Sequence, residues 1–230
     1  MSDKSYDVVI TGGGQKGIVL AMYLTKYGGL SVGLFEEPSP GFVGNTCSNS
    51  HQYWYQTALY WDFPEFKDYG ARYAHTSTIV GTAFDDDTCF LQFSAFPDVD
   101  PGQERTAELI SRFSRKDAET YLWLWNKSIN YWLPNMLEWM NNPAKPVREP
   151  DAMDRLIMNP DSGIDPHWLL MNPVQLFTSL FEDPHVQVGF FRTIQSWGIA
   201  ADEPGAGWPA LLAQFAWNPF HVYAVGELTP

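Results

Sequence analysis

Apolar and small residues at the start of the chain follow a pattern that predicts a strand, a glycine turn, a helix and a second strand. Residues 8–10 form a short apolar run, and apolar residues then recur at helical spacing from Ile18 onward. Gly28 and Gly29 end this predicted helix, and a second apolar run follows at 32–35. Such a βαβ start predicts a parallel sheet, because parallel strands need a crossover connection.

The pattern changes between residues 38 and 100 to loops and short strands, rich in glycine, proline and aromatic residues. The best strand candidates are 69–80 and 88–96, and the acidic run 85–87 predicts a turn between them. Three adjacent carboxylates are also a candidate cation site. A metal cluster would need further ligands that the neighbourhood does not offer, so the solvated turn is the preferred interpretation.

The rest of the chain is mostly helical by pattern. Two helices are predicted over 103–113 and 115–141, with Ser114 as the N-cap of the second. The second helix carries an apolar stripe, which predicts a core-facing side, with an aromatic ligand wall as the alternative. The stripe consists of Trp125, Ile129, Trp132, Leu133, Met136 and Trp139. Further helical candidates are 151–158, 167–181 and 185–197, and an apolar stretch follows at 208–225.

Composition narrows the partners and the compartment. The chain has 230 residues, of which 45% are hydrophobic, and a formal net charge of -13, which argues against nucleic acid and anionic membrane surfaces. Cys47 and Cys89 lack the spacing of a zinc or redox motif, which predicts two reduced thiols in a cytoplasmic protein. The polar start indicates no signal peptide, and no apolar run has the length of a transmembrane segment. The many aromatic residues leave peripheral membrane contact or an apolar ligand open.

Three glycines in the turn of the βαβ pattern match a dinucleotide-binding fingerprint. Gly12 permits the tight turn, Gly14 lets the backbone approach a pyrophosphate, and Gly17 allows close helix–strand packing. The helix N-terminus offers free N–H groups to the phosphates, and Glu36 at the end of the second strand is placed to bind ribose hydroxyls. A purely structural glycine turn is the alternative. The position near the N-terminus, followed by a long aromatic segment, favours FAD over NAD.

The chain also resembles a known family. The segments "DVVITGGGQKGIVLAMYL" and "LSVGLFEE", "VGN" at 43–45, and "DPGQERTAELISRFSRKDAETYLWLWNK" at 100–127 resemble the FAD-dependent phytoene desaturase-like oxidoreductases. The resemblance includes the branch named for a pyridine nucleotide-disulfide oxidoreductase domain. It implies an FAD-binding domain of the glutathione-reductase type, interrupted by a substrate domain, that removes hydride from an apolar, isoprenoid-like substrate.

The resemblance assigns roles to particular positions. It places the FAD pyrophosphate on the glycine loop, the adenosine ribose at Glu36, and the flavin side of the cofactor near Gly44. Glu37 stands where a basic residue is common, and Asn45 follows Gly44 where a second glycine is usual. The predicted cofactor-binding residues are Gly12, Gly13, Gly14, Gln15, Lys16, Gly17, Glu36, Glu37, Gly44 and Asn45.

The expected architecture is α/β, with a Rossmann-like parallel sheet at the N-terminus and a mostly helical substrate domain. Residues 1–100 are predicted to be the first part of the FAD-binding domain, and 101–230 an incomplete substrate domain. Family members continue well beyond this length, so the chain is expected to be a fragment or one subunit of a split enzyme. The alternatives are a non-catalytic binding or assembly partner, including a homo-oligomer, and an NAD-linked dehydrogenase. No histidine, serine or cysteine stands out as catalytic, and no metal site is predicted.

Overall fold

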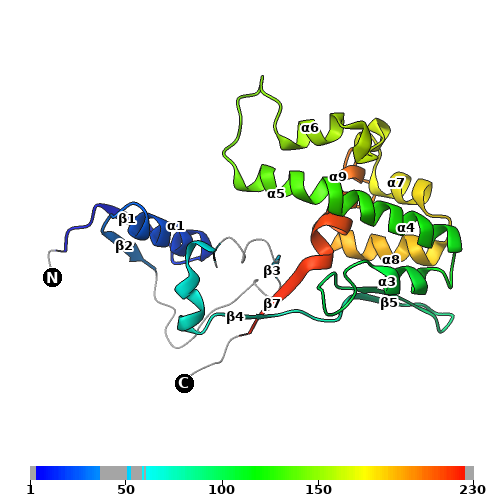
Figure 1. Ribbon diagram of the computed structural model, residues 1–230, viewed down its shortest axis with the longest axis horizontal. Helices are drawn as coiled ribbons and strands as arrows, with labels where there is room; N and C mark the ends of the chain where they lie inside the picture. Colours follow the sequence, from blue (N-terminus) through cyan, green and yellow to red (C-terminus); the bar gives the residue numbers. More distant parts are fainter. Residues whose placement is uncertain (1–3, 37–50, 53–58, 60, 226–230) are drawn as a thin grey trace. The chain divides into compact units, whose positions relative to one another are not determined.

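The computed structural model describes residues 4–36, 51–52, 59 and 61–225 of a mixed α/β chain with small sheets (Figure 1). The chain divides into two compact units, residues 1–48 and 49–230. The predicted division at residue 100 concerns the FAD-binding and substrate domains and stays a prediction. In packing terms, the described strands between residues 51 and 93 belong with the helices that follow residue 100.

The first unit is a βαβ unit of β1 (Val8–Thr11), α1 (Gln15–Lys26) and β2 (Val32–Phe35). β1 and β2 pair in parallel, with Val8 opposite Val32 and Thr11 opposite Phe35. The strand, helix and strand predicted from the apolar pattern are therefore confirmed, as is the parallel pairing. A two-stranded sheet does not by itself make a Rossmann fold.

Local contacts fix both ends of this crossover. The Asp7 carboxylate accepts hydrogen bonds from the Ser31 hydroxyl at 2.6 Å and from the Ser31 N–H at 2.9 Å. These bonds lower the pKa of Asp7, because they stabilise its charged form. After α1, Gly29 has a φ of +63°, and the Leu30 N–H donates back to Leu24 O at 3.1 Å. The helix end predicted at Gly28 and Gly29 is thus present, and Gly29 has the left-handed backbone conformation that often follows a helix.

The second unit holds five short strands in two antiparallel sheets. One sheet has the order β3 (His51–Gln52), β7 (His221–Val225), β4 (Arg72–Ala74). The other is a hairpin of β5 (Thr78–Ala83) and β6 (Cys89–Phe93). The turn predicted at 85–87 is confirmed, because it joins these two strands. The single strand predicted over 69–80 is wrong, because this segment contains β4 and the start of β5, which pair in different sheets.

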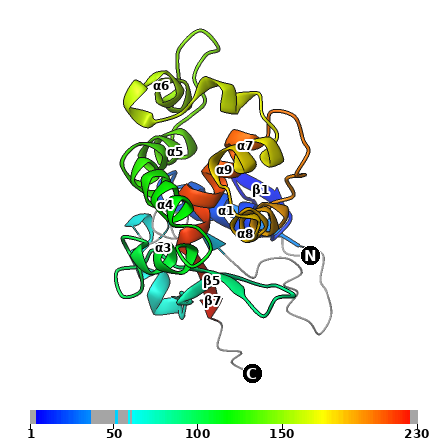
Figure 2. The same cartoon turned by 90° about the vertical axis from the view of Figure 1, so that its right-hand side faces the viewer.

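Seven α-helices are described in the second unit (Figure 2), and most of them contribute side chains to a common hydrophobic core. They are α3 (Glu104–Ile110), α4 (Arg115–Lys127), α5 (Leu133–Asn141), α6 (Ala152–Met158), α7 (Pro173–Leu180), α8 (Pro184–Gln195) and α9 (Gly207–Leu212). Short 3₁₀ turns cover Pro64–Tyr69, Pro160–Ser162, Pro166–Leu169 and Asn218–Phe220. Two π-helical turns, Ser128–Trp132 and Ala213–Trp217, interrupt the longer helical runs.

Side-chain caps set where several helices begin. Ser114 caps α4 by accepting the Asp117 N–H at 3.1 Å, as predicted. Asp151 and Asn172 form capping boxes at α6 and α7, each satisfying N–H groups that have no partner inside the helix. Pro184 follows the N-cap Asp183 at the start of α8, where a missing N–H costs nothing.

The helix predicted over 115–141 follows a continuous path but changes its hydrogen-bond pattern at Ser128–Trp132. A π-turn takes up an additional residue and rotates the following helix relative to the preceding one. Trp125, Trp132 and Met136 of the apolar stripe are buried, which confirms the core-facing interpretation for them. Trp139 is 53% exposed, and its indole N–H donates to Asp151 at 3.0 Å. For this residue the core interpretation is wrong, because its ring lies at the surface and bonds to Asp151.

Aromatic rings form the centre of the second unit. Phe190 of α8 is fully buried, and its ring centroid lies 4.9 to 6.0 Å from five other aromatic rings. These rings belong to Phe90, Tyr121, Phe177, Phe181 and Phe215. They come from the hairpin, three helical segments and the end of α7, so this cluster joins most of the unit.

A buried carboxylate joins α4 to the start of α8. Both oxygens of Asp117 accept backbone hydrogen bonds, from the Glu182 N–H at 2.8 Å and the Asp183 N–H at 2.9 Å. Asp117 is fully buried, so its loss would remove two charge-assisted hydrogen bonds to the partly buried N–H groups of Glu182 and Asp183.

We expect Asp117→Ala to lower the free energy of unfolding by about 2 kcal/mol, because hydrogen bonds to a charged group contribute on that order. The measurement is urea unfolding followed by circular dichroism. Glu119→Ala, on the exposed side of the same helix, is the control and is expected to change the stability by no more than about 0.5 kcal/mol. Equal effects of the two substitutions would contradict a role for the buried carboxylate.

Candidate functional site

The glycine loop between β1 and α1 has the geometry expected of a phosphate-binding turn. Gly12 follows β1 directly, and its φ of +102° lies in a region that side chains rarely adopt. The Gly12 N–H donates to Phe35 O at 2.8 Å, which joins the loop to the end of β2. The tight turn expected at Gly12 is therefore present.

Gly17 provides close packing of α1 against the loop. A Cβ atom on Gly17 would lie 2.2 Å from Gly12 O and 3.5 Å from the Ile10 side chain. Both distances are within the first unit, and the first is far below van der Waals contact. Only glycine fits at this position without moving the backbone, as the fingerprint requires.

Gly14 differs from Gly17 because nothing of this chain occupies the space beside it. A Cβ atom on Gly14 would meet no atom within 4 Å, and the φ of -67° is open to any residue. Gly14 is the N-cap of α1, with no side-chain cap hydrogen bond and no acidic residue in the first turn. The first turn of α1 itself therefore supplies no anionic side chain to the positive end of the helix dipole, an end that attracts anions.

Glu36 lies beside this loop, directly after β2. Its side chain is exposed, and its carboxylate accepts a hydrogen bond from the Gly13 N–H. Glu36 thus lies beside the glycine loop, as predicted, because Gly13 and Glu36 are in contact although they are 23 positions apart in the sequence. The contact also shows that a loop N–H is directed at an anionic oxygen.

The structure describes only some of the remaining predicted site residues. Gln15 and Lys16 begin α1 and are exposed, next to the open space at Gly14. Glu37, Gly44 and Asn45 lie outside the described residues. The flavin side of the expected site therefore has no described geometry.

Comparisons with known proteins add no family. No protein-family model matches the sequence, and the search of curated proteins also gave no match. The resemblance to phytoene desaturase-like oxidoreductases stays a prediction that depends on the residues alone.

Other candidate groups do not form a catalytic arrangement within the part of the chain that the structure describes. His75 contacts Asp98 at 3.0 Å, and burial lowers the pKa of His221. Cys89 is a free, exposed thiol, and Cys47 lies outside the described residues. Groups of three or more metal-ligating side chains do not occur among the described residues. Within the same residues, no helix has the length and apolar character needed to cross a membrane.

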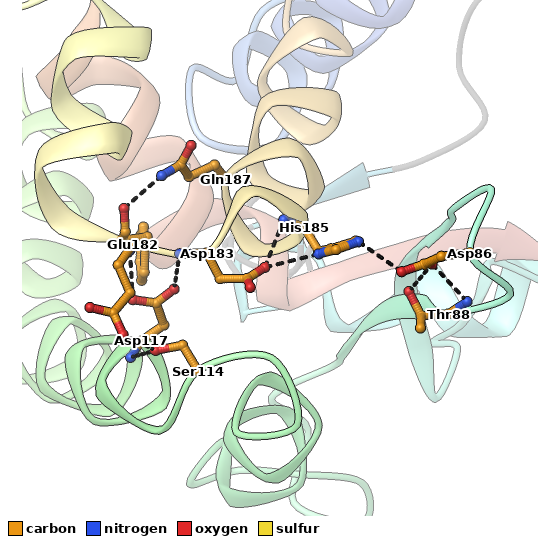
Figure 3. A network of polar contacts seen from close by, with 9 residues as sticks. Asp86, Thr88, Ser114, Asp117, Glu182, Asp183, His185 and Gln187 are labelled. Atoms are coloured by element: carbon orange, nitrogen blue, oxygen red, sulfur yellow. Dashed lines mark hydrogen bonds and ion pairs between the residues drawn. The ribbon is translucent and has the colours of Figure 1, made fainter.

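The sequence analysis missed a polar network in the second unit (Figure 3). The network joins the hairpin turn, the start of α4 and the start of α8 through Asp86, Asp117 and His185. One signal for it was present in the sequence. The tripeptide Asp-Pro-His occurs twice, at 165–167 and 183–185, and aspartate before proline is typical of a helix start.

Proposed function

We propose that this chain binds the ADP portion of FAD at the glycine loop and belongs to a flavin-dependent oxidoreductase. The observation that carries the proposal is the combination of three features in one loop. These are the open space beside Gly14, the close approach of Gly17 to Gly12 O, and the Gly13 N–H directed at the Glu36 carboxylate. The residues present fit an ADP group.

Each residue of the loop has a task in this proposal. The unpaired N–H groups at the start of α1 hold the diphosphate, and the missing Cβ of Gly14 lets it approach. The Glu36 carboxylate accepts hydrogen bonds from the ribose hydroxyls and repels a 2′-phosphate. When bound, the flavin would supply the hydride acceptor, while the protein orients the substrate and excludes water.

The strand arrangement after β2 supports FAD rather than NAD as the cofactor. An ordinary NAD-binding domain continues with further parallel βα units. In the described residues from 51 to 225, every strand pair is antiparallel. The apolar, isoprenoid-like substrate class depends on the resemblance alone, and the absence of paired cysteine motifs supports a cytoplasmic location.

The proposal is tested by binding measurements on the purified full chain. We expect the chain to bind FAD, seen as flavin absorbance that stays with the protein during gel filtration. ADP is expected to compete with FAD, because it carries the part that the loop recognises. FMN, which lacks the ADP portion, is the matched control and is expected not to compete. A chain that binds neither FAD nor ADP would overturn the proposal, and one that prefers NAD would support an NAD-linked dehydrogenase.

A further inference from the structure

Two copies of one tripeptide give the chain an internal comparison. In Asp165-Pro166-His167 and in Asp183-Pro184-His185, the aspartate is the N-cap and the histidine N–H donates to it, at 2.9 and 2.8 Å. In both, the histidine Nδ1 also lies close to the same aspartate oxygen, at 2.9 and 3.1 Å. The local sequence alone therefore produces this His–Asp contact.

Only the second histidine has another carboxylate on its other ring nitrogen. His185 Nε2 lies 3.2 Å from Asp86 Oδ2, in the turn of the β5–β6 hairpin (Figure 3). The His185 side chain is 31% exposed, whereas that of His167 is 80% exposed. One ring thus links two segments that are far apart in the sequence.

The two ring contacts require different protonation states unless the ring is charged. A neutral imidazole has one N–H donor and one unprotonated nitrogen, whereas the imidazolium has two donors. If neutral His185 donates from Nδ1 to Asp183, the lone pair of Nε2 faces the Asp86 carboxylate and repels it. If the proton is on Nε2 instead, the ring donates to Asp86, and the lone pair of Nδ1 repels the Asp183 carboxylate. Both contacts together need the charged ring.

Acidic side chains lie around the His185 ring. Asp86 and Asp183 are the carboxylates in contact, and Asp85 and Asp87 lie in the same turn as Asp86. Neither Asp86 nor Asp183 contacts a lysine or arginine within the described residues, so His185 is the positive group for both. The positive end of the α8 dipole opposes the charge, because His185 lies in the first turn of that helix.

Two aromatic rings complete the surroundings from the other elements. Phe113, between α3 and α4, stacks on the His185 ring at 4.9 Å, and Phe84 of the hairpin meets it edge-on at 4.6 Å. A cation over the face of an aromatic ring is attracted to it. The stacked arrangement also holds the imidazole in the plane that directs both nitrogens at the carboxylates.

The Asp86 carboxylate is held in place for this contact. Its Oδ1 accepts from the Thr88 N–H at 3.1 Å and from the Thr88 hydroxyl at 2.6 Å, so Oδ2 is the oxygen that faces His185. The hairpin is anchored to α8 a second time at Gly189, where a Cβ would lie 2.6 Å from the Phe90 ring. The contact between His185 and Asp86 therefore affects the turn of the hairpin, whereas its strands stay packed on α8 at Gly189.

We propose that His185 forms a pH-dependent link between the turn of the β5–β6 hairpin and the N-terminus of α8. The charged ring holds the turn, and the neutral ring releases it. The local contact to Asp183 stays in the neutral state, because it is set by neighbouring residues, and the contact to Asp86 opens. The contact to Asp86 is therefore present with the charged ring and lost with the neutral ring. This inference does not depend on the proposed function.

Hydrogen–deuterium exchange of the full chain tests this pH-dependent link at about pH 5.5 and about pH 8, with correction for the intrinsic pH dependence of exchange. The reporter is the hairpin turn, where the Phe84 N–H donates to Thr88 O at 3.0 Å. In the wild type, we expect protection of this turn to fall about threefold at the higher pH, as suits a partly exposed ion pair. His185→Gln is expected to remove this difference, and His167→Gln, the matched control, to keep it.

The Asp86→Asn variant provides a second test, in which protection of the turn is not expected to fall at the higher pH. The amide keeps an oxygen for Thr88, and its NH₂ group can donate to the unprotonated Nε2 of neutral His185. We therefore expect the turn of this variant to be at least as well protected at about pH 8 as at about pH 5.5. A wild-type turn with equal protection at both values, or a loss of protection at the higher pH that persists in His185→Gln or in Asp86→Asn, would overturn the proposal.

Discussion

Gly14→Ala is expected to weaken FAD and ADP binding strongly while leaving the stability of the chain unchanged. The new methyl group meets no atom of the protein within 4 Å, and the backbone at Gly14 suits any residue. The methyl would instead occupy the space through which the backbone approaches the diphosphate. We expect affinity for FAD to fall by about a hundredfold, as for the loss of roughly 3 kcal/mol of binding energy. Isothermal calorimetry with FAD and with ADP measures the effect.

Gly17→Ala is the matched comparison within the same loop. Its methyl group would lie 2.2 Å from Gly12 O, so the substitution should disturb the βαβ unit itself. We expect lower protection of the β1 amides from hydrogen exchange in this variant and normal protection in Gly14→Ala. Full affinity for FAD in Gly14→Ala would show that the loop is a structural turn and not a phosphate site.

Phe190→Ala is expected to destabilise the second unit by about 4 kcal/mol, the upper part of what a large-to-small core substitution costs. The ring is fully buried among five other aromatic rings, so its removal leaves a cavity that the rigid neighbours cannot fill. Stability margins of folded domains are about 5–15 kcal/mol, so this single change removes a large part of the margin. Chemical denaturation followed by near-ultraviolet circular dichroism measures the loss.

Phe191→Ala is the neighbouring control on the same helix. Phe191 is only half-buried, and its ring contacts the Phe177 ring at 5.8 Å. We expect it to cost about 1 kcal/mol, the usual size of a substitution outside the core. A similar cost for both substitutions would contradict the central role of Phe190.

Local patterns made the βαβ unit and most helix starts predictable. Apolar runs, the glycines at 28 and 29, and the N-cap Ser114 act over a few residues, and each appears in the structure as expected. Glu36 was also predictable, because the length of one βαβ crossover fixes where the end of β2 meets the loop.

Features that depend on distant residues were not predictable. The segment 69–80 looks like one strand, but its two ends pair with β7 and β6, and only tertiary contacts decide between them. The π-turn at Ser128–Trp132 leaves no mark in the apolar spacing, and neither does the Asp151 partner that Trp139 finds at the surface. The Asp86 partner of His185 was hidden for the same reason, although the repeated Asp-Pro-His was visible.

The order β3-β7-β4 has a consequence for how the chain folds. The central strand of this sheet is β7 (His221–Val225), whereas both of its partners precede residue 75. A ribosome-bound chain therefore exposes β3 and β4 without their partner until nearly all of the helical segments have been synthesised. Because closing such long loops is slow, we expect this sheet to form after the helical core, as the last cooperative step of folding.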